Sequence, residues 1–374
     1  MITRSEVDKL LSLRAEQPSV LSLYLSVPVD IAGLRELPAQ AGDLYAEAVR
    51  SGNGSGTLRG VGRREQETVR GLLTERARDW LGHTVAIFAS EELGLTEAIP
   101  LPAGLPQRAV LASRPHVRPL LLAIQRSPAY RVVVADRRHA WLFSVVGDEI
   151  STAALPAADE VRSHRFSGWY GLEAHRVNER IMGLQRQHLQ ATAALLERSA
   201  RVGGTEPLVI GGHRDTIPQV FGALRADLRD AVAGSFVADP ATLTPAKVRE
   251  LAGRVVADWL AERDEELAAQ LRQEPPDGLS AVGLTACLAA AGQHATRLIA
   301  LPEDGLLPGY ACGECGALSV SGDGCVHGRQ AVQHVPDLME ELAVAALADA
   351  ARVRTISEPP AGVAALLRFR LAPA

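Results

Sequence analysis

The chain has 374 residues, with 39 lysines and arginines against 44 aspartates and glutamates, so its formal net charge is -5. At roughly 100–200 residues per domain, this length predicts two or three domains that each bury a core. Hydrophobic residues make up 47% and charged residues 22%, which excludes a wholly disordered chain. No apolar run reaches the ~20 residues of a membrane span, and four cysteines are too few for a disulfide scaffold. We therefore expect a cytoplasmic protein in a reducing compartment.

The positive charge comes almost entirely from arginine, because only two lysines occur, Lys9 and Lys247. One interpretation of this bias is the codon usage of a GC-rich genome. The alternative is a preference for guanidinium groups, which hold phosphate through two hydrogen bonds. The mildly acidic total does not exclude a nucleic-acid partner, because the local distribution of charge decides that.

The first part of the chain predicts a small α+β domain. Ser5 begins an amphipathic opening helix, and the alternating residues 20–27 predict a strand. Residues 51–56 read Ser-Gly-Asn-Gly-Ser-Gly and predict a flexible loop. A charged amphipathic helix over 63–81 and a strand over 83–89 follow.

The middle part predicts a mixed sheet covered by helices. Residues 130–136 and 140–146 predict a hairpin that turns at Asp136–His139. The other predicted elements are a strand-sized apolar segment at 120–124, a helix at 175–201, a strand at 208–212, a helix at 217–232 and a long helix from Thr244 to about Gln273. Thr244 is the expected N-cap of that last helix, with proline at its first position.

The last part predicts a compact α/β sandwich after the chain break Glu274-Pro-Pro-Asp-Gly. Its predicted elements are a helix at 279–291, a strand at 295–301, a helix at 337–350, a strand at 353–357 and a last strand at 366–371. The predicted domains are an N-terminal α+β domain over 1–125, a middle domain over 126–274 and a C-terminal α/β domain over 275–374, which contains a Cys-rich insert at 310–328.

This Cys-rich insert carries the sharpest local motif of the sequence. It reads Cys312-Gly-Glu-Cys315, followed by Cys325-Val-His327. Four ligands of this kind suit tetrahedral Zn²⁺, and structural zinc sites fill all four positions with protein ligands. The sequence therefore predicts a structural zinc site, with His334 as the rival fourth ligand. A redox pair and no role at all are the alternatives, and Cys287 is expected to be a small core residue.

Residues 161–188 form a locally basic segment that also contains aromatic side chains. The candidate RNA-binding residues within it are Arg162, Arg165, Trp169, Tyr170, His175, Arg176 and Arg180. Guanidinium groups bind phosphate and aromatic rings stack on unpaired bases, so this composition suits RNA. The alternative is a solvated helix whose aromatic side chains anchor an ordinary loop.

Several segments resemble a known superfamily. Residues 283–300 read Gly-Leu-Thr-Ala-Cys-Leu-Ala-Ala-Ala-Gly-Gln-His-Ala-Thr-Arg-Leu-Ile-Ala, and residues 362–371 read Gly-Val-Ala-Ala-Leu-Leu-Arg-Phe-Arg-Leu. Both resemble the C-terminal domain of the archaeal and eukaryotic class-I peptide chain release factor and Pelota superfamily. The segments Val132-Val-Val-Ala-Asp-Arg-Arg and Leu208-Val-Ile-Gly-Gly resemble its RNase H-like middle domain. Together with the opening strand at 21–25, this order is similar to the bacterial branch, and zinc-ribbon-like inserts occur in the C-terminal domain of some members.

Two departures from the superfamily's motifs bear on function. Release factors carry Gly-Gly-Gln in the middle-domain loop, where the glutamine positions a water molecule. The matching loop here reads Phe166-Ser-Gly-Trp-Tyr-Gly-Leu-Glu-Ala-His-Arg and has no glutamine before Gln185. The decoding motif of release factors also needs an Asn-Ile-Lys-Ser lysine, which neither Lys9 nor Lys247 supplies. The resemblance therefore implies no stop-codon reading.

The resemblance implies a ribosome-associated translation factor that binds the ribosomal A site for hibernation or rescue. The expected partners are rRNA and tRNA, with a translational GTPase as a further one, and neither DNA nor a membrane. One alternative is an enzyme, a peptidyl-tRNA hydrolase with a diverged loop in which Glu173 or His175 orients the water. The other alternative is a zinc-stabilised interaction protein without a ribosomal role.

Overall fold

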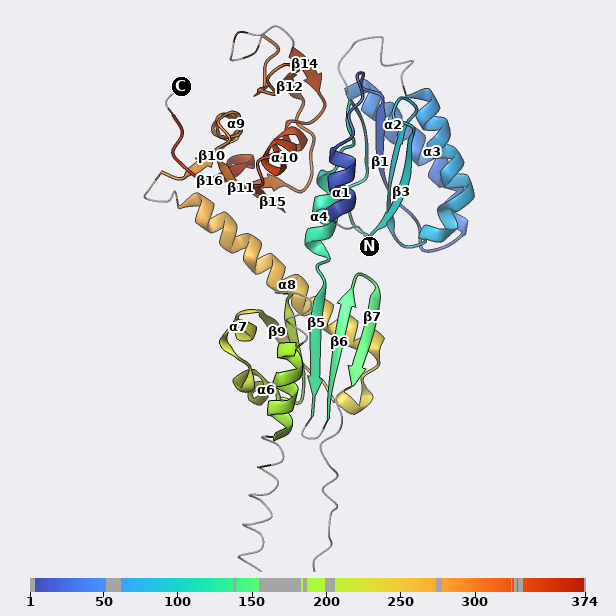
Figure 1. Cartoon of the computed structure of the whole chain (residues 1–374). Coiled ribbons are helices and arrows are strands. Elements are labelled where there is room, and N and C mark those ends of the chain that lie inside the picture. The colour runs from blue at the N-terminus through green and yellow to red at the C-terminus, as the bar shows by residue number, and fades with distance from the viewer. Residues whose placement is uncertain are drawn as a thin grey trace, which may run out of the picture. The chain divides into compact units, whose positions relative to one another are not determined.

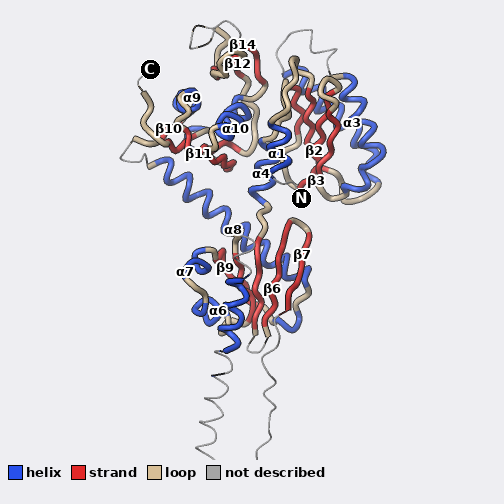
Figure 2. The backbone as a smooth tube through the Cα atoms, viewed as in Figure 1, coloured by secondary structure: helices blue, strands red, loops and turns tan. Residues whose placement is uncertain are grey.

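The structure is a computed structural model, which describes residues 4–51, 62–136, 139–154, 183, 187–198, 206–273, 278–323, 325, 328 and 332–372. Its contacts divide the chain into two compact units (Figures 1 and 2). Unit 1 comprises Met1–Arg126 and Asp264–Ala374, and unit 2 comprises Ser127–Arg263. The three-domain division stays a prediction, whereas the presence of several α/β parts with separate sheets is confirmed.

The N-terminal part of unit 1 is built on an antiparallel sheet with the strand order β3-β2-β1-β4. Its elements are α1 (Arg4–Leu11), β1 (Val20–Ser26), η1 (Ala32–Glu36), α2 (Leu37–Ser51), α3 (Arg63–Arg76), η3 (Ala77–Trp80), β2 (Thr84–Ser90), β3 (Leu95–Leu101), β4 (Arg108–Ala112) and α4 (Arg118–Arg126). Alternation along β1 separates two cores. Leu21 and Leu23 pack in a cluster with Leu73 of α3, whereas Val20 and Tyr24 belong to a second cluster on the opposite face.

The C-terminal part of unit 1 contains a mixed sheet with the order β10-β16-β11-β15. Its elements are β10 (Ser280–Val282), α9 (Leu284–Gly292), β11 (Thr296–Pro302), β12 (Gly309–Cys312), β13 (Leu318–Ser319), β14 (Val332–Val335), α10 (Leu338–Ala348), β15 (Arg352–Ile356), η5 (Pro360–Gly362) and β16 (Ala364–Leu367). The strands β13-β12-β14 form a separate small sheet. One buried cluster includes Leu120 of α4 together with Ile299 and Leu342, so the two parts of unit 1 share a core.

Unit 2 is built on a five-stranded sheet with the order β7-β6-β5-β8-β9. Its elements are β5 (Tyr130–Ala135), β6 (Ala140–Val146), β7 (Glu149–Ala154), a helical segment at 187–198, β8 (Leu208–Gly212), α6 (Ile217–Ala223), α7 (Ala226–Asp230), β9 (Val232–Val237), η4 (Pro240–Thr242) and the first part of α8 (Pro245–Arg272). β6 and β7 are antiparallel neighbours on one side of β5, and β8 and β9 run parallel to it on the other.

Both faces of the unit 2 sheet are covered. Val133 of β5 packs with Leu196 of the helical segment and Val220 of α6 on one face. Val132 packs with Val248 of α8 on the other face. The helix α8 also contributes to unit 1, where Leu271 is part of a buried cluster with β11, β15 and β16. Among the helices of the described ranges, none is long and apolar enough to cross a membrane.

Several predicted elements are confirmed at their ends. The hairpin turns as expected, with the backbone N–H of His139 donating to the Asp136 carboxylate over 2.6 Å. Thr244 accepts a 3.3 Å hydrogen bond from the backbone N–H of Lys247 and caps α8, which ends at Arg272. The predicted loop at 51–56 lies outside the described residues apart from Ser51, where α2 ends.

Four predicted elements were wrong in type or extent. Residues 120–124, which are apolar and of strand length, lie in the helix α4 and not in a strand, and the residues of α4 from Arg118 to Ala123 are all buried. The helix predicted at 217–232 is divided into α6 and α7 and gives way to β9 at Val232. At 279–291 the chain forms β10 before α9, and Gly283 between them has a φ of 86°, which favours glycine. The last strand is shorter than predicted and ends at Leu367.

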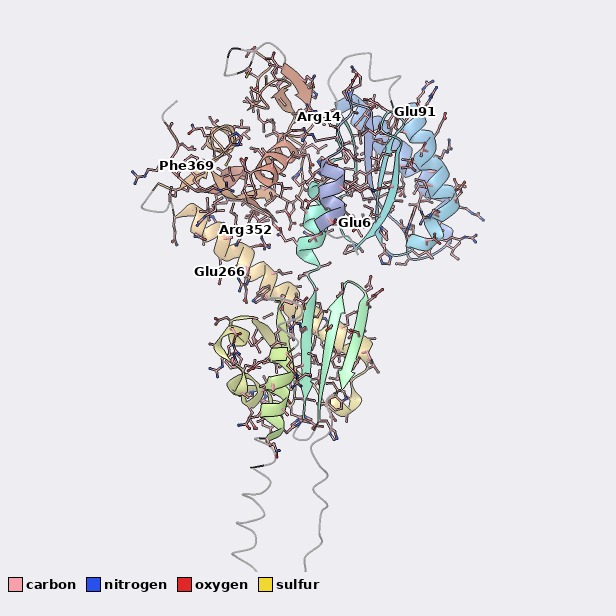
Figure 3. All side chains as sticks on the ribbon, in the orientation of Figure 1. Glu6, Arg14, Glu91, Glu266, Arg352 and Phe369 are labelled. Carbon is pink, nitrogen blue, oxygen red and sulfur yellow. The ribbon has the colours of Figure 1, made fainter. Side chains whose placement is uncertain are left out.

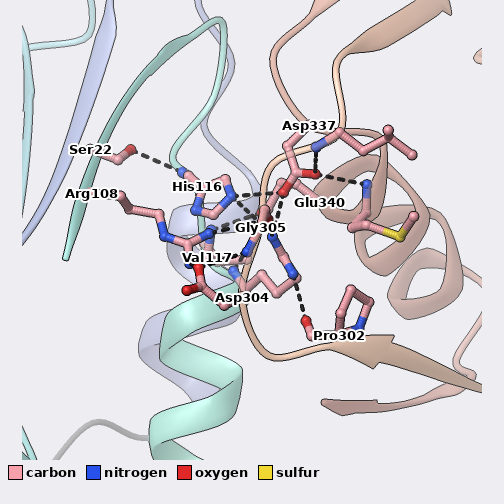
Figure 4. Close-up of polar contacts among 12 residues, drawn as sticks. Ser22, Arg108, His116, Val117, Pro302, Asp304, Gly305, Asp337 and Glu340 are labelled. Atoms are coloured by element: carbon pink, nitrogen blue, oxygen red, sulfur yellow. Dashed lines mark hydrogen bonds and ion pairs between the residues drawn. The ribbon is translucent and has the colours of Figure 1, made fainter. Parts of the chain in front are cut away.

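Four buried polar side chains join the two parts of unit 1 (Figure 4). They are His116, Arg118, Asp337 and Glu340, which we call the buried charge cluster. The carboxylate of Asp337 accepts a 2.9 Å hydrogen bond from the Arg118 guanidinium and lies 3.1 Å from His116 Nε2. The same carboxylate accepts the backbone N–H of Met339 and caps the N-terminus of α10.

Glu340 completes this cluster from the next turn of α10. Its two carboxylate oxygens accept the backbone N–H groups of Val117 and Arg118, each over 2.8 Å. These groups open α4 and have no partner within that helix, so a side chain from the C-terminal part caps a helix of the N-terminal part. The Arg118 guanidinium also donates to the carbonyl oxygens of Pro302, over 2.6 Å, and Gly305.

The environment of Asp337 shifts its titration strongly. Burial by itself raises the pKa of this carboxyl group, but the hydrogen bond to His116 and the charges of Arg118 and His116 outweigh burial. The resulting pKa is about 2, against an ordinary value of 3.8. The ionised form of Asp337 is therefore the one that holds the two parts of unit 1 together.

Candidate metal centre

The predicted metal ligands lie around the small sheet of unit 1. Cys312 is the last residue of β12, which pairs with β13 and β14. The chain then turns tightly: the backbone N–H of Gly316 donates to the Cys312 carbonyl over 2.9 Å, and the Cys312 N–H donates to the Ala317 carbonyl over 2.8 Å. Gly316 has a φ of 73°, where a side chain is disfavoured, so glycine is needed for the turn that brings Cys315 back beside Cys312.

Three cysteine sulfur atoms converge at this turn. The Sγ atoms of Cys312, Cys315 and Cys325 all lie within 4.8 Å of one another. The Cys315 and Cys325 sulfurs are 3.3 Å apart. Zn²⁺ bound tetrahedrally at about 2.3 Å from each sulfur holds its thiolates about 3.8 Å apart. The spacing of the three sulfurs therefore fits a single ion of this size.

Backbone groups at the turn stabilise thiolates. The N–H groups of Cys315 and Glu314 donate to the Cys312 sulfur and lower the pKa of that thiol. The N–H of Ala317 acts in the same direction on Cys315, but contacts with Cys325 and Cys312 and partial burial raise the pKa of Cys315 overall. Adjacent thiolates repel each other, and a bound cation removes that repulsion. The donor set thus suits a soft divalent metal, with Zn²⁺ as the common occupant of a Cys-rich site.

The fourth ligand position is not assigned by the described residues. His327, the predicted fourth ligand, lies outside them. His334, its rival, is described on β14 opposite Tyr310 and packs edge-on against that ring, with centroids 5.7 Å apart. It does not belong to the cysteine group. Its Nε2 is buried and has no hydrogen-bond partner in the described part of the chain, and burial lowers its pKa.

The other predicted site residues lie outside the described residues. These are the RNA-binding candidates Arg162, Arg165, Trp169, Tyr170, His175, Arg176 and Arg180 and the catalytic candidates Glu173 and His175. Cys287, expected to be a core residue, is buried on α9, and burial raises the pKa of its thiol to about 12. The prediction that Cys287 is a small core residue is therefore confirmed.

Sequence reasoning missed the buried charge cluster. His116 and Asp337 are separated by 221 positions, so no local pattern links them. The one available signal was the placement of Asp337 just before an apolar helical run, which marks an N-cap but not its distant partners.

The fold and this site together define a multidomain α/β protein with three cysteines gathered at one turn. Residues 115–262 match the family model "Bacterial archaeo-eukaryotic release factor family 10". The matched stretch is less than half of the chain, and over it the sequence is similar to that bacterial family. The resemblance predicted from the sequence is thereby confirmed over these residues. No match was found among curated proteins.

Solved structures of low sequence identity also match. Archaeal Pelota, from a model of ribosome-bound archaeal Pelota and ABCE1, is 17% identical, with 78% of this chain and 79% of that chain covered and a TM-score of 0.43. S. cerevisiae Dom34, a translation termination-like factor, is 11% identical, with 79% and 82% covered and a TM-score of 0.37. The archaeal translation termination factor aRF1 is 14% identical, with 98% and 96% covered and a TM-score of 0.24.

Proposed function

We propose that this protein is a cytoplasmic ribosome-associated factor that occupies the ribosomal A site for hibernation or rescue and does not read stop codons. The observation that carries the proposal is the family match over 115–262 combined with the absence of Gly-Gly-Gln from the matching loop of this chain. A member of the superfamily without that motif keeps the means to bind but lacks the glutamine that positions water. Binding is therefore the proposed activity.

The proposal assigns RNA contact to residues 161–188. This segment lies in the sequence between β7 and β8 of unit 2 and carries arginines beside Trp169 and Tyr170. Guanidinium groups and aromatic rings together bind single-stranded RNA through phosphate contacts and base stacking. The mixed sheet of unit 2, with an antiparallel hairpin on one side of β5 and parallel strands on the other, supports the RNase H-like interpretation of the middle domain. A translational GTPase is the further proposed partner.

The cysteine centre is proposed to bind structural Zn²⁺ through Cys312, Cys315, Cys325 and His327. Its role is to fix the turn after β12, since a site with four protein ligands leaves no position open for substrate. Zinc content of the purified protein tests the fourth ligand. We expect His327→Ala to lower it and His334→Ala to leave it unchanged, and the reverse result would make His334 the ligand.

Co-sedimentation with 70S ribosomes at physiological salt tests the proposed function. We expect the protein to pellet with ribosomes, and the double variant R176A/R180A to lose at least tenfold in affinity because two phosphate contacts are removed. The double variant R254A/R263A, which removes two exposed arginines of α8, is the matched control and keeps the affinity. Absence of ribosome and tRNA binding by the unmodified protein contradicts the proposal.

The peptidyl-tRNA hydrolase alternative requires Glu173 or His175 to act as the group that orients water. Release of the peptide from peptidyl-tRNA on ribosomes separates it from the binding function. We expect no release above the uncatalysed rate. Release that disappears in Glu173→Ala or His175→Ala, with ribosome binding intact, establishes the enzyme instead.

A further inference from the structure

Unit 1 contains a cavity of about 540 Å³, which lies within the range of small-molecule sites. It is lined by parts of 14–18 and 111–114 from the N-terminal part and by parts of 311–318, 333–336 and 341–345 from the C-terminal part. Arg14, labelled in Figure 3, lies on its N-terminal side. The cavity is thus built by both halves of the discontinuous unit, next to the cysteine turn.

Two charged side chains face each other in this cavity without a hydrogen bond. Arg114, which follows β4, and Glu341 of α10 are 3.7 Å apart, and the side chain of each is 14% exposed. Arg114 Nε is buried and has no partner in the described part of the chain. No hydrogen bond to the Glu341 carboxylate is found among the described residues either. A guanidinium donor and a carboxylate acceptor therefore lie side by side with hydrogen-bonding capacity that no protein group uses. Buried polar groups rarely remain without such partners.

The rest of the lining is mixed, because it also contains the polar residues Arg14, Glu16, Gln17, Ser113, Gln333 and His334. Aliphatic carbon comes from Leu111 and Ala112 on one side and from Leu318, Val344 and Ala345 on the other. The apolar part of the lining offers contact area to a flat ring. A ligand that fits must combine an apolar face with one polar edge that carries donors next to an acceptor.

We propose that this cavity binds a guanine base, with its N1–H and N2–H groups donating to the Glu341 carboxylate and its O6 accepting from the Arg114 guanidinium. Guanine presents two neighbouring donors beside an acceptor, which matches a carboxylate next to a guanidinium. Adenine places an amino donor against the arginine and a ring-nitrogen acceptor against the carboxylate, so both contacts are lost. This inference does not rest on ribosome binding.

The source of the base, a free nucleotide or a residue of an RNA strand, is distinguished by the probes. Calorimetry on the full chain compares GMP with IMP and AMP. We expect GMP to bind at least tenfold more tightly than AMP, with IMP between them because it lacks only the N2 amino group. In parallel, an oligouridine carrying one central guanosine is compared with plain oligouridine. Tighter binding of the guanosine-containing strand without GMP binding assigns the site to RNA, and GMP binding alone assigns it to the free nucleotide.

Variants of the two polar side chains test the geometry. Glu341→Gln retains the size of the side chain but places an amide donor against the donors of guanine, so we expect at least a tenfold loss for the guanine ligand and little change for AMP. Arg114→Lys keeps the charge and removes the planar donor pair, with a similar loss. Glu262→Gln on the exposed side of α8 is the matched control and leaves binding unchanged. Thermal unfolding verifies that each variant is folded.

The proposal is overturned by any of three results. These are no binding of GMP and no preference for the guanosine-containing strand, equal affinities for GMP and AMP where GMP binds, or unchanged guanine affinity in folded Glu341→Gln.

Discussion

The cysteine centre and the buried charge cluster are both sets of polar groups in unit 1, but they are assembled in opposite ways. The three cysteines lie between positions 312 and 325 and meet at one turn. The charge cluster joins residues 116–118 to residues 337–340. The carboxylates of the cluster find their partners within the protein, whereas the cysteine sulfurs of the centre lie close enough together to hold a metal ion from outside.

Because the two sets are assembled differently, we expect different consequences when one residue of each is removed. Removing one member of the charge cluster leaves the others buried without a counter-charge, so the cost falls on the fold of unit 1. Removing a cysteine is expected mainly to lower the affinity of the centre for a metal ion. The following experiments are ordered by the size of the effect that this comparison predicts.

The largest effect is expected for Asp337→Ala. This change leaves Arg118 and His116 buried without their carboxylate and removes the N-cap of α10. Breaking a buried ion pair from one side destabilises proteins by about 3–5 kcal/mol, and we expect a loss of that size in the free energy of unfolding. Urea denaturation followed by circular dichroism measures it. A loss below about 1 kcal/mol contradicts the view that this cluster holds unit 1 together.

A smaller loss is expected on acidification. The pKa of Asp337 is about 2 in the folded protein against an ordinary 3.8, so the unfolded state binds a proton more readily. The stabilisation is fully present above pH ~4 and is lost as the pH falls towards 2, with a total of roughly 2 kcal/mol. Denaturation curves between pH 5 and 2 measure the slope. Asp337→Ala should show a shallower acid dependence, and an equal slope in both proteins attributes the effect to other carboxyl groups.

Loss of a zinc ligand is expected to lower the stability of unit 1 less than either Asp337→Ala or acidification. Cys315→Ser should lower bound zinc at least tenfold and lower the unfolding midpoint by less than Asp337→Ala does, because the small sheet is separate from the main sheets. Cys287→Ser is the matched control and should retain zinc, since that thiol is buried away from the centre. Metal analysis and thermal unfolding give both quantities. Full zinc content in Cys315→Ser would remove this residue from the ligand set.

The smallest effect is expected for an exposed ion pair. Glu250 on α8 pairs with Lys247 at 2.8 Å and with Arg254 at 2.8 Å. These side chains are about half exposed or more, so water and salt screen the attraction. We expect Glu250→Gln to leave the unfolding midpoint unchanged within error. A shift comparable to that of Asp337→Ala would show that burial does not decide the strength of ionic contacts here.

Local signals in the sequence predicted the features whose partners lie within a few residues. The Cys312-Gly-Glu-Cys315 turn, the Asp136–His139 hairpin and the Thr244 cap each depend on positions at most four apart, and the structure has all three. Secondary structure was predicted wrongly where a short apolar run belongs to a longer helix, as in α4, or where one glycine separates a strand from a helix, as at Gly283.

The remaining features depend on chain topology, which no short pattern records. The Arg114–Glu341 pair and the Arg118–Asp337 pair each require residues more than two hundred positions apart to meet. Single residues such as Asp337 carry a local signal as helix caps, but their partners are fixed only when both parts of unit 1 are folded. A sequence alone therefore identifies the metal motif and not the contacts between the two parts.

The shared core of unit 1 has a consequence for synthesis. Residues of α1 and α4 bury their apolar side chains in the same cluster as α9, α10 and β11. The ribosome completes α4 before it has made the whole of unit 2 and the strands beyond it. At 5–20 residues per second, the newly made N-terminal part waits on the order of 10–50 s with one apolar face uncovered. Apolar surface exposed in this way makes a folding intermediate prone to aggregation, and slow translation of unit 2 prolongs the exposure.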